Sequence, residues 1–163
     1  MIRKAELKDA SRLAEILIFT KRVTYRDVFR DDMTSFGKMQ VVPLARSFEE
    51  NPSLLNDVFV WDDGIVKAMI RRGKLTGEKR ELCELYVDPF FQGEGMGKAL
   101  IRDFEENARK DGCGSIWLWA LEQNETAIRF YEHLGFSASK TKQELPECPG
   151  FFVVKYEKKL SEK

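Results

Sequence analysis

The sequence has few cysteines, a single histidine, no excess of charge and no long apolar run. The 27 basic and 27 acidic side chains cancel, so no global field attracts nucleic acid or an anionic membrane surface. No stretch approaches the roughly 18 apolar residues of a membrane-spanning helix, and the charged N-terminus does not resemble a signal peptide. One histidine cannot supply a histidine-rich metal centre, and the cysteines show no Cys-x-x-Cys spacing. We therefore expect a cytoplasmic protein with reduced thiols, no metal, and neither nucleic acid nor a membrane as partner.

The chain is long enough to bury a core of its own. It has 163 residues, of which 43% are hydrophobic and 33% charged, as is usual for a globular protein. No internal repeat and no linker divides it. These properties predict a single domain over residues 1–163.

The first half of the chain has strand and helix patterns in turn. Asp9 is expected to cap a helix that buries Ala10, Leu13, Ile16 and Leu17 at helical spacing. An Asp-Gly pair at Asp63-Gly64, between two apolar runs, predicts a hairpin. The remaining predictions are a strand at 1–5, a helical region at 20–50, strands at 58–61, 65–70 and 81–87, and an exposed loop at 71–80.

The second half alternates more regularly. A helix is predicted from Gly97 to about Asp111, followed by a buried strand at 115–121. Asn124 is expected to cap a helix that ends near Leu134, and two strands follow near 136–138 and 151–156. Hairpins first and a β-α-β unit later predict an α/β fold (an α+β mixed sheet).

The glycine-rich stretch between the strand at 81–87 and the next helix is the most informative part of the sequence. Glycines at 93, 95 and 97 let backbone N–H groups converge without obstruction by Cβ atoms. The following helix adds the positive end of its dipole, which favours a phosphate or diphosphate. A tight strand-to-helix connection without a ligand is the simpler interpretation of the glycines alone.

Two nucleotide-binding motifs do not fit this turn. A P-loop requires Gly-Lys-Ser/Thr, whereas Gly97-Lys98 is followed by Ala99. A dinucleotide fingerprint requires Gly-x-Gly-x-x-Gly in the first strand-to-helix turn, whereas this turn lies past the middle of the chain. A nucleotide-binding protein of another fold therefore stays only as a minor alternative, testable by ATP or NAD binding.

At these residues the chain resembles the GNAT superfamily of acyl-CoA-dependent N-acyltransferases. That family's signature, Gln/Arg-x-x-Gly-x-Gly/Ala after a strand ending in Val-x-Pro, matches Gln92–Gly97 and Val87–Pro89. A second motif of the family, Asn-x-x-Ala-x-x-x-Tyr-x-x-x-Gly-Phe, matches Asn124–Phe136. The strong resemblance covers residues 82–136. It implies the GNAT fold, in which two central parallel strands, here 81–87 and 115–121, splay apart and are flanked by helices.

The resemblance also implies an N-acetyltransferase that uses acetyl-CoA as cosubstrate. The acetyl group would pass to an amine of a small molecule or a protein by direct attack through a tetrahedral intermediate. The alternative is a non-catalytic acyl-CoA-binding sensor or regulatory module, and a homodimer is left open. The residues implied to bind acetyl-CoA are Leu85, Tyr86, Val87, Gln92, Gly93, Glu94, Gly95, Met96, Gly97, Lys98, Asn124 and Tyr131.

The catalytic candidates are Tyr131, Glu84 and Glu81. Tyr131 is the candidate general acid for the CoA thiolate, and the Val87 N–H is the candidate oxyanion donor. Glu81 and Glu84 are alternative general bases, which a regular strand would direct to opposite faces. The simpler interpretation of each is a surface carboxylate.

Two further expectations concern the surroundings of these residues. Trp117 and Trp119 share a strand face, and a core role is favoured for both over contact with the substrate. The resemblance implies that the choice of acceptor amine is set by about residues 20–36 and 139–150. In the first of these segments neither charge sign predominates.

Overall fold

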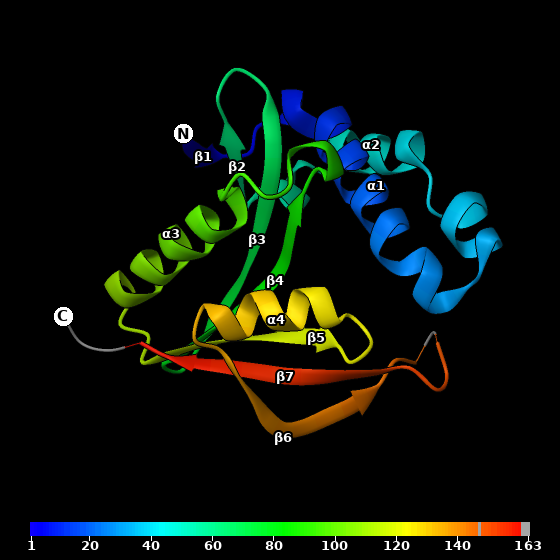
Figure 1. Cartoon of the computed structure of the whole chain (residues 1–163). Helices are drawn as coiled ribbons and strands as arrows, with labels where there is room; N and C mark the ends of the chain where they lie inside the picture. Colours follow the sequence, from blue (N-terminus) through cyan, green and yellow to red (C-terminus); the bar gives the residue numbers. More distant parts are fainter. Residues whose placement is uncertain (147, 161–163) are drawn as a thin grey trace. The chain divides into compact units, whose positions relative to one another are not determined.

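A computed structural model describes residues 1–146 and 148–160, and Figure 1 shows its helices and strands. Short 3₁₀ or π segments lie at Leu7–Asp9, Met33–Lys38, Pro52–Leu55 and Pro89–Phe91. The main elements are β1 (Ile2–Lys4), α1 (Ala10–Phe29), α2 (Val41–Glu50), β2 (Val58–Asp62), β3 (Val66–Thr76), β4 (Lys79–Val87), α3 (Met96–Lys110), β5 (Ser115–Leu121), α4 (Glu125–His133), β6 (Ser137–Glu144) and β7 (Phe152–Lys159).

The strands form one mixed sheet in the order β1-β2-β3-β4-β5-β7-β6. The pairs β1–β2, β2–β3, β5–β7 and β7–β6 are antiparallel, whereas β4 and β5 are parallel. A parallel pair needs a crossover connection, which α3 supplies. The predicted mixed sheet with helices between its later strands is confirmed.

The chain packs as two compact units. Unit 1 comprises residues 1–71 and 84–101, and unit 2 comprises residues 72–83 and those from 102 onward. The elements β3, β4 and α3 each pass from one unit to the other. The expectation of a single domain over the whole chain stays a prediction.

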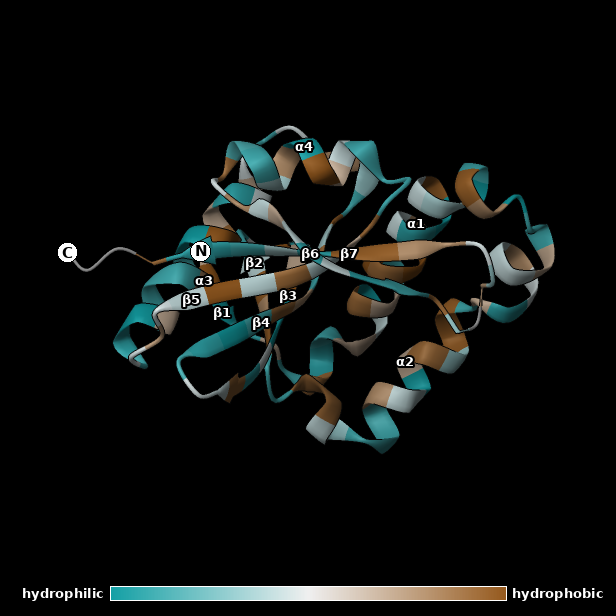
Figure 2. Cartoon of the chain, turned by 90° about the horizontal axis from the view of Figure 1, so that it is seen from below, coloured by the Kyte–Doolittle hydropathy of each residue, from teal (hydrophilic) through white to brown (hydrophobic). Residues whose placement is uncertain are grey.

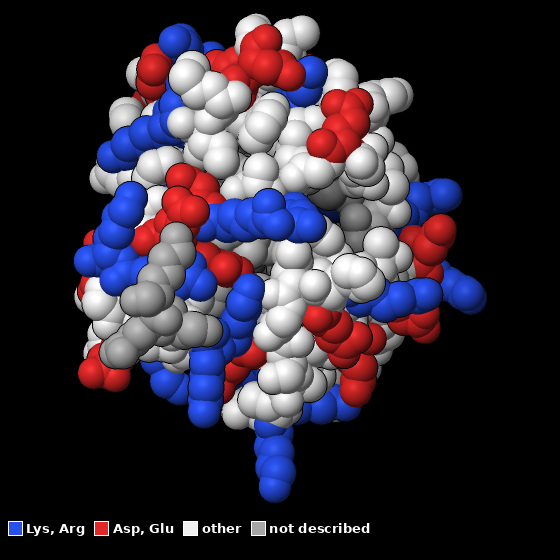
Figure 3. Space-filling view, turned by 60° about the vertical axis from the view of Figure 1, so that its left-hand side comes forward, with Lys and Arg blue, Asp and Glu red and all other residues white. Residues whose placement is uncertain are grey.

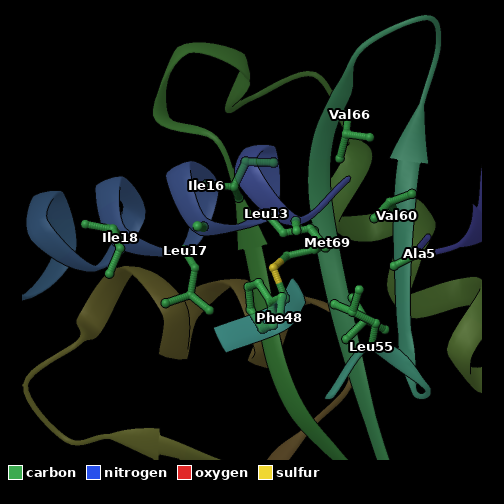
Figure 4. Packing of buried hydrophobic residues seen from close by; sticks show 13 residues of the cluster. Ala5, Leu13, Ile16, Leu17, Ile18, Phe48, Leu55, Val60, Val66 and Met69 are labelled. Atoms are coloured by element: carbon green, nitrogen blue, oxygen red, sulfur yellow. The ribbon is translucent and has the colours of Figure 1, made fainter. Parts of the chain in front are cut away.

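The core of unit 1 lies between α1, α2 and the strands β2 and β3. Figure 4 shows Leu13 and Leu17 of α1 on the side of Phe48 of α2 and Met69 of β3, and Ile16 belongs to the same buried cluster. The stripe predicted for α1 is confirmed, because its members Ala10, Leu13, Ile16 and Leu17 are all buried. The helix extends to Phe29, where Arg30 adopts a left-handed conformation with φ of 51° and ends it.

In unit 2, α4 lies along one face of β5 and β7 (Figure 1). Strand β5 alternates between apolar and less apolar residues, visible as brown and pale bands in Figure 2. Ile116 and Leu118 are fully buried on one face. Trp117 and Trp119 lie on the other face and are only partly buried, so the expected core role is wrong. The ammonium of Lys155 lies 4.6 Å from the Trp117 ring centroid, a cation–π contact on that face.

Two sequence-based expectations are corrected by the structure. Residues 71–80 are not a loop, because β3 continues to Thr76 and β4 begins at Lys79, which leaves only a tight turn at Gly77. Asp9 stands at the N-cap position of α1, but its side chain makes no cap bond to that helix. Its carboxylate instead accepts from the backbone N–H of Glu6 at 2.8 Å and from Arg3.

The Arg3–Asp9 pair joins β1 to the start of α1. Arg3 donates from Nη1 and Nη2 to the two carboxylate oxygens of Asp9 at 2.7 and 2.9 Å, and from Nε to Asp62 at 2.8 Å. The hydrogen bonds with Arg3 lower the pKa of Asp9 below its ordinary value. The pKa of Asp62 is also lowered, first by the Gly64 N–H and then by Arg3.

These lowered pKa values predict a pH-dependent stability. An aspartate in the unfolded chain has a pKa of about 3.9, and in the folded protein the pKa of both aspartates is lower. The stabilisation by their hydrogen bonds is therefore complete well above about pH 3.9 and is lost as the pH falls through the folded pKa. We expect Asp9→Asn to reduce the free energy of unfolding at pH 7 by about 1.5–3 kcal/mol. The variant should also flatten the fall of stability between about pH 5 and 2. Urea unfolding across this range measures both, and equal slopes in the two proteins would contradict the assignment.

Within the part of the chain that the structure describes, no helix is long and apolar enough to cross a bilayer. Basic and acidic side chains are interspersed on the face shown in Figure 3, in agreement with the balanced composition.

Candidate functional site

The glycine turn of unit 1 connects the end of β4 to α3. A single 3₁₀ turn at Pro89–Phe91 precedes it. Gly93 and Gly95 have φ angles of 85° and 84°, which side chains with a Cβ rarely adopt. A Cβ atom at either glycine would meet no atom within 4 Å, so the surface above the turn is open to a ligand.

The first turn of α3 supplies the donors of this candidate site. The first intrahelical bond joins the Ala99 N–H to the carbonyl of Gly95 at 3.0 Å. The N–H groups of Met96, Gly97 and Lys98 precede it and have no carbonyl one turn earlier to bind. Such N–H groups and the helix dipole favour a bound anion.

Side chains around the turn divide into buried and exposed groups. Met96 is 4% exposed and Gly97 is buried, so these two residues can offer a ligand only their backbone. Lys98 is exposed and brings a positive charge to the start of α3. Glu94 is exposed as well.

The end of β4 lies next to this turn within unit 1. Leu85, Tyr86 and Val87 are partly buried, and Tyr86 packs against the core cluster of α1 and α2. The carbonyl of Val87 accepts from the Thr20 hydroxyl at 3.2 Å and from the Gln92 side-chain amide at 3.3 Å. The side chain of the signature residue Gln92 therefore binds the backbone at the end of β4.

The parallel pairing between β4 and β5 is short. It runs from Lys79 opposite Ser115 to Glu81 opposite Trp117, whereas the strands continue to Val87 and Leu121.

Each candidate base on β4 lies beside a residue of β3. A Cβ atom on Gly73 would lie 2.8 Å from the Cβ of Glu81, so these two residues share a face. Glu84 pairs with Arg71, whose Nε donates to its carboxylate at 2.9 Å, and Arg71 lies two residues before Gly73 on β3. The expectation that Glu81 and Glu84 point to opposite faces of the strand stays a prediction.

The two candidates of unit 2 lie on α4. Asn124 caps this helix as predicted, with its side-chain oxygen accepting from the Ala127 N–H at 3.2 Å. Tyr131 is partly buried, and its ring lies 5.3 Å from that of Phe130 and 5.7 Å from that of Phe136. His133 is exposed at the last position of the helix. The donor-binding candidates of unit 1 thus form one group, and Asn124 and Tyr131 form a second.

The sequence motifs missed three polar residues beside the turn, namely Arg12, Thr20 and Asp88. Asp88 stands between the Val and Pro of the signature and is 1% exposed. Its position before a proline indicated only the end of a strand. Its position directly after a strand was the one feature of the sequence that could have singled out Asp88 as a site residue.

Among residues 1–146 and 148–160, no group of three or more His, Cys, Asp or Glu side chains is arranged to hold a metal ion.

Comparison with known proteins gives one consistent result. The model of the Acetyltransferase (GNAT) family matches residues 22–136. An uncharacterized N-acetyltransferase of Methanocaldococcus jannaschii is 47% identical, over 75% of this chain and 64% of that protein. The glucosamine 6-phosphate N-acetyltransferase of Trypanosoma brucei brucei is 40% identical, over 46% of this chain and 47% of that protein. The chain thus spans less than two thirds of the length of either relative.

A solved structure matches over nearly the whole chain. It is the PaiA N-acetyltransferase from Thermoplasma acidophilum in complex with coenzyme A, with a TM-score of 0.75 and 23% identity. The match covers 98% of both chains. At this identity the likeness concerns the fold alone.

Proposed function

This chain belongs to the GNAT family of acetyltransferases, and on that basis we propose that it transfers the acetyl group of acetyl-CoA to an amine. The fold expected from the resemblance is confirmed by the mixed sheet and by the match to a solved N-acetyltransferase. The acceptor proposed is an amine of a small molecule or a protein, and the place of action proposed is the cytoplasm.

The glycine turn is the single observation that carries the proposal. Its positive φ angles and the first N–H groups of α3 suit a diphosphate, and the open surface above Gly93 and Gly95 gives it access. Residues 92–98 would hold the diphosphate of acetyl-CoA. The backbone of Leu85, Tyr86 and Val87 would pair with its pantetheine arm, and Asn124 and Tyr131 would contact it from α4.

Acetyl transfer requires a neutral amine, a hydrogen-bond donor for the developing oxyanion and a proton for the leaving thiolate. An alkyl ammonium with a pKa of about 10.4 must lose its proton, which at pH 7 costs about 4.6 kcal/mol. The Val87 N–H would donate a hydrogen bond to the carbonyl oxygen as negative charge develops on it. The Tyr131 hydroxyl, protonated at neutral pH, would give its proton to the departing thiolate, whose pKa is about 8.5.

The base is proposed to be a glutamate on β4. The Glu84 side chain is 20% exposed, and its carboxylate is paired with Arg71. Glu81, on the same strand, is the second candidate. Whichever of Glu81 and Glu84 is the base, we expect its substitution by Gln to lower kcat by about 10²–10⁴-fold and to shift the pH profile of kcat. Glu81→Gln and Glu84→Gln serve as controls for each other, and normal kcat in both would contradict a glutamate base on β4.

A thiol-release assay tests the function. Acetyl-CoA is incubated with the protein and a panel of small amines and peptide N-termini, and free CoA thiol is followed with a chromogenic disulfide. Amine-dependent release is expected for at least one acceptor class. Acetyl-CoA binding by calorimetry without release for any amine would favour the sensor alternative.

A further inference from the structure

The corner between β4 and the glycine turn contains a buried charge that the signature does not require. Asp88 is 1% exposed, and its side chain accepts two hydrogen bonds within unit 1. One comes from Nη2 of Arg12 at 2.5 Å, and the other from the backbone N–H of Phe90 at 2.9 Å. Both carboxylate oxygens are therefore occupied.

Hydrogen bonds to backbone carbonyls of β3 also hold this segment in place. The N–H of Asp88 donates to the carbonyl of Lys67 at 2.9 Å. Arg12 also donates from Nε to the carbonyl of Val66 at 2.9 Å. A single arginine of α1 thus binds both the buried carboxylate and the neighbouring strand. Contacts with both α1 and β3 therefore fix the position and direction of the backbone at Asp88.

Asp88 stands between the two parts of unit 1 proposed to hold acetyl-CoA. Val87, the proposed oxyanion donor, directly precedes it. The 3₁₀ turn that leads to Gln92 begins on it, and the N–H of Phe91 donates to the Asp88 carbonyl at 2.9 Å. A rotation at this residue would turn the glycine N–H groups relative to the end of β4.

An ion pair with a buried carboxylate contributes little to stability by itself. Removing two charges from water is costly, and well-packed apolar residues of similar volume often stabilise a fold equally well. Hydrogen bonds to a charged carboxylate are directional, however, and they define an orientation that apolar contacts do not.

We propose that Asp88, held by Arg12, is a positioning residue that orients the glycine turn against the end of β4 for acetyl-CoA. This inference rests on the proposed function and adds a residue to which the motifs assign no role.

The test uses a second Arg–Asp pair of unit 1, also with a buried carboxylate, as its control. Asp9 is 5% exposed, and its carboxylate accepts hydrogen bonds from Arg3 at 2.7 and 2.9 Å. It lies at the start of α1, and none of its described hydrogen bonds reaches the glycine turn. Asp88→Asn and Asp9→Asn are compared by thermal unfolding and by calorimetric titration with acetyl-CoA. We expect both to unfold at lower temperature, but only Asp88→Asn to lose acetyl-CoA affinity, by roughly 10- to 100-fold, which is the effect of losing one charge-assisted hydrogen bond between the turn and the diphosphate.

A second variant separates position from stability. Arg12→Met combined with Asp88→Leu replaces the pair by apolar side chains, which should keep the fold even where Asp88→Asn does not. The double variant should unfold near the temperature of the unaltered protein and still bind acetyl-CoA at least tenfold more weakly. Unchanged affinity in a folded variant would overturn the positioning role alone. Failure of the unaltered protein to bind acetyl-CoA would overturn the proposed function and this role with it.

Discussion

We expect Tyr131→Phe to lower kcat by about 10²–10⁴-fold while acetyl-CoA affinity changes little. The ring of Tyr131 packs edge-on against Phe130 and Phe136, and these contacts survive the substitution. Only the hydroxyl, and with it the proton offered to the leaving thiolate, is removed. Measurement of kcat at saturating acetyl-CoA beside a direct binding constant separates the two effects.

A second tyrosine of unit 2 provides the control. Tyr156 of β7 is buried, and burial raises its pKa above the ordinary value, so its hydroxyl is a weaker acid. Tyr156→Phe should therefore leave kcat unchanged. If Tyr131→Phe instead keeps its kcat and loses about 0.5–1.5 kcal/mol of acetyl-CoA binding, Tyr131 is a binding residue and another group is the acid.

The second large effect is expected at Gly95. Gly95→Val places a branched side chain on the open surface above the turn and on a residue with φ of 84°. We expect acetyl-CoA affinity to fall by roughly 10- to 100-fold or more, because the diphosphate can no longer approach the N–H groups of the turn and loses charge-assisted hydrogen bonds. Calorimetry with acetyl-CoA measures the loss.

Backbone strain must be distinguished from blocked access. Gly112, after the end of α3, has a φ of 79° and equally open space around a Cβ atom. Gly112→Val should cost similar strain, about 1–3 kcal/mol of stability, and should leave acetyl-CoA binding intact. Equal affinities of the two valine variants would remove the glycine turn from the binding site.

The sequence alone predicted those parts of the protein whose structure depends on neighbouring residues. The alternation of β5 and the cap of α4 by Asn124 follow from periodicity and from the preference of a short polar side chain for a helix start. The glycines at 93 and 95 indicated a backbone that other residues rarely adopt, and both have positive φ angles. The family resemblance rests on the same local stretches.

Only the tertiary structure decided which partners the charged residues take. Asp9 looked like a helix cap by position, yet it binds Arg3 because β1 brings that guanidinium to the start of α1. Residues 71–80 looked like a loop by composition, yet pairing within the β3–β4 hairpin holds the segment extended. Local preference was overridden in both places by contacts that appear only when the elements pack.

The candidate site divides in the same way. Motif spacing was sufficient to find the glycine turn, Asn124 and Tyr131, because each lies in a short segment with its own pattern. The ion pair of Glu84 with Arg71 depends on the pairing of two strands, and that of Asp88 depends on Arg12, 76 residues away in the chain. Such contacts are set by strand register and by helix packing between distant segments, which no periodicity within one segment encodes.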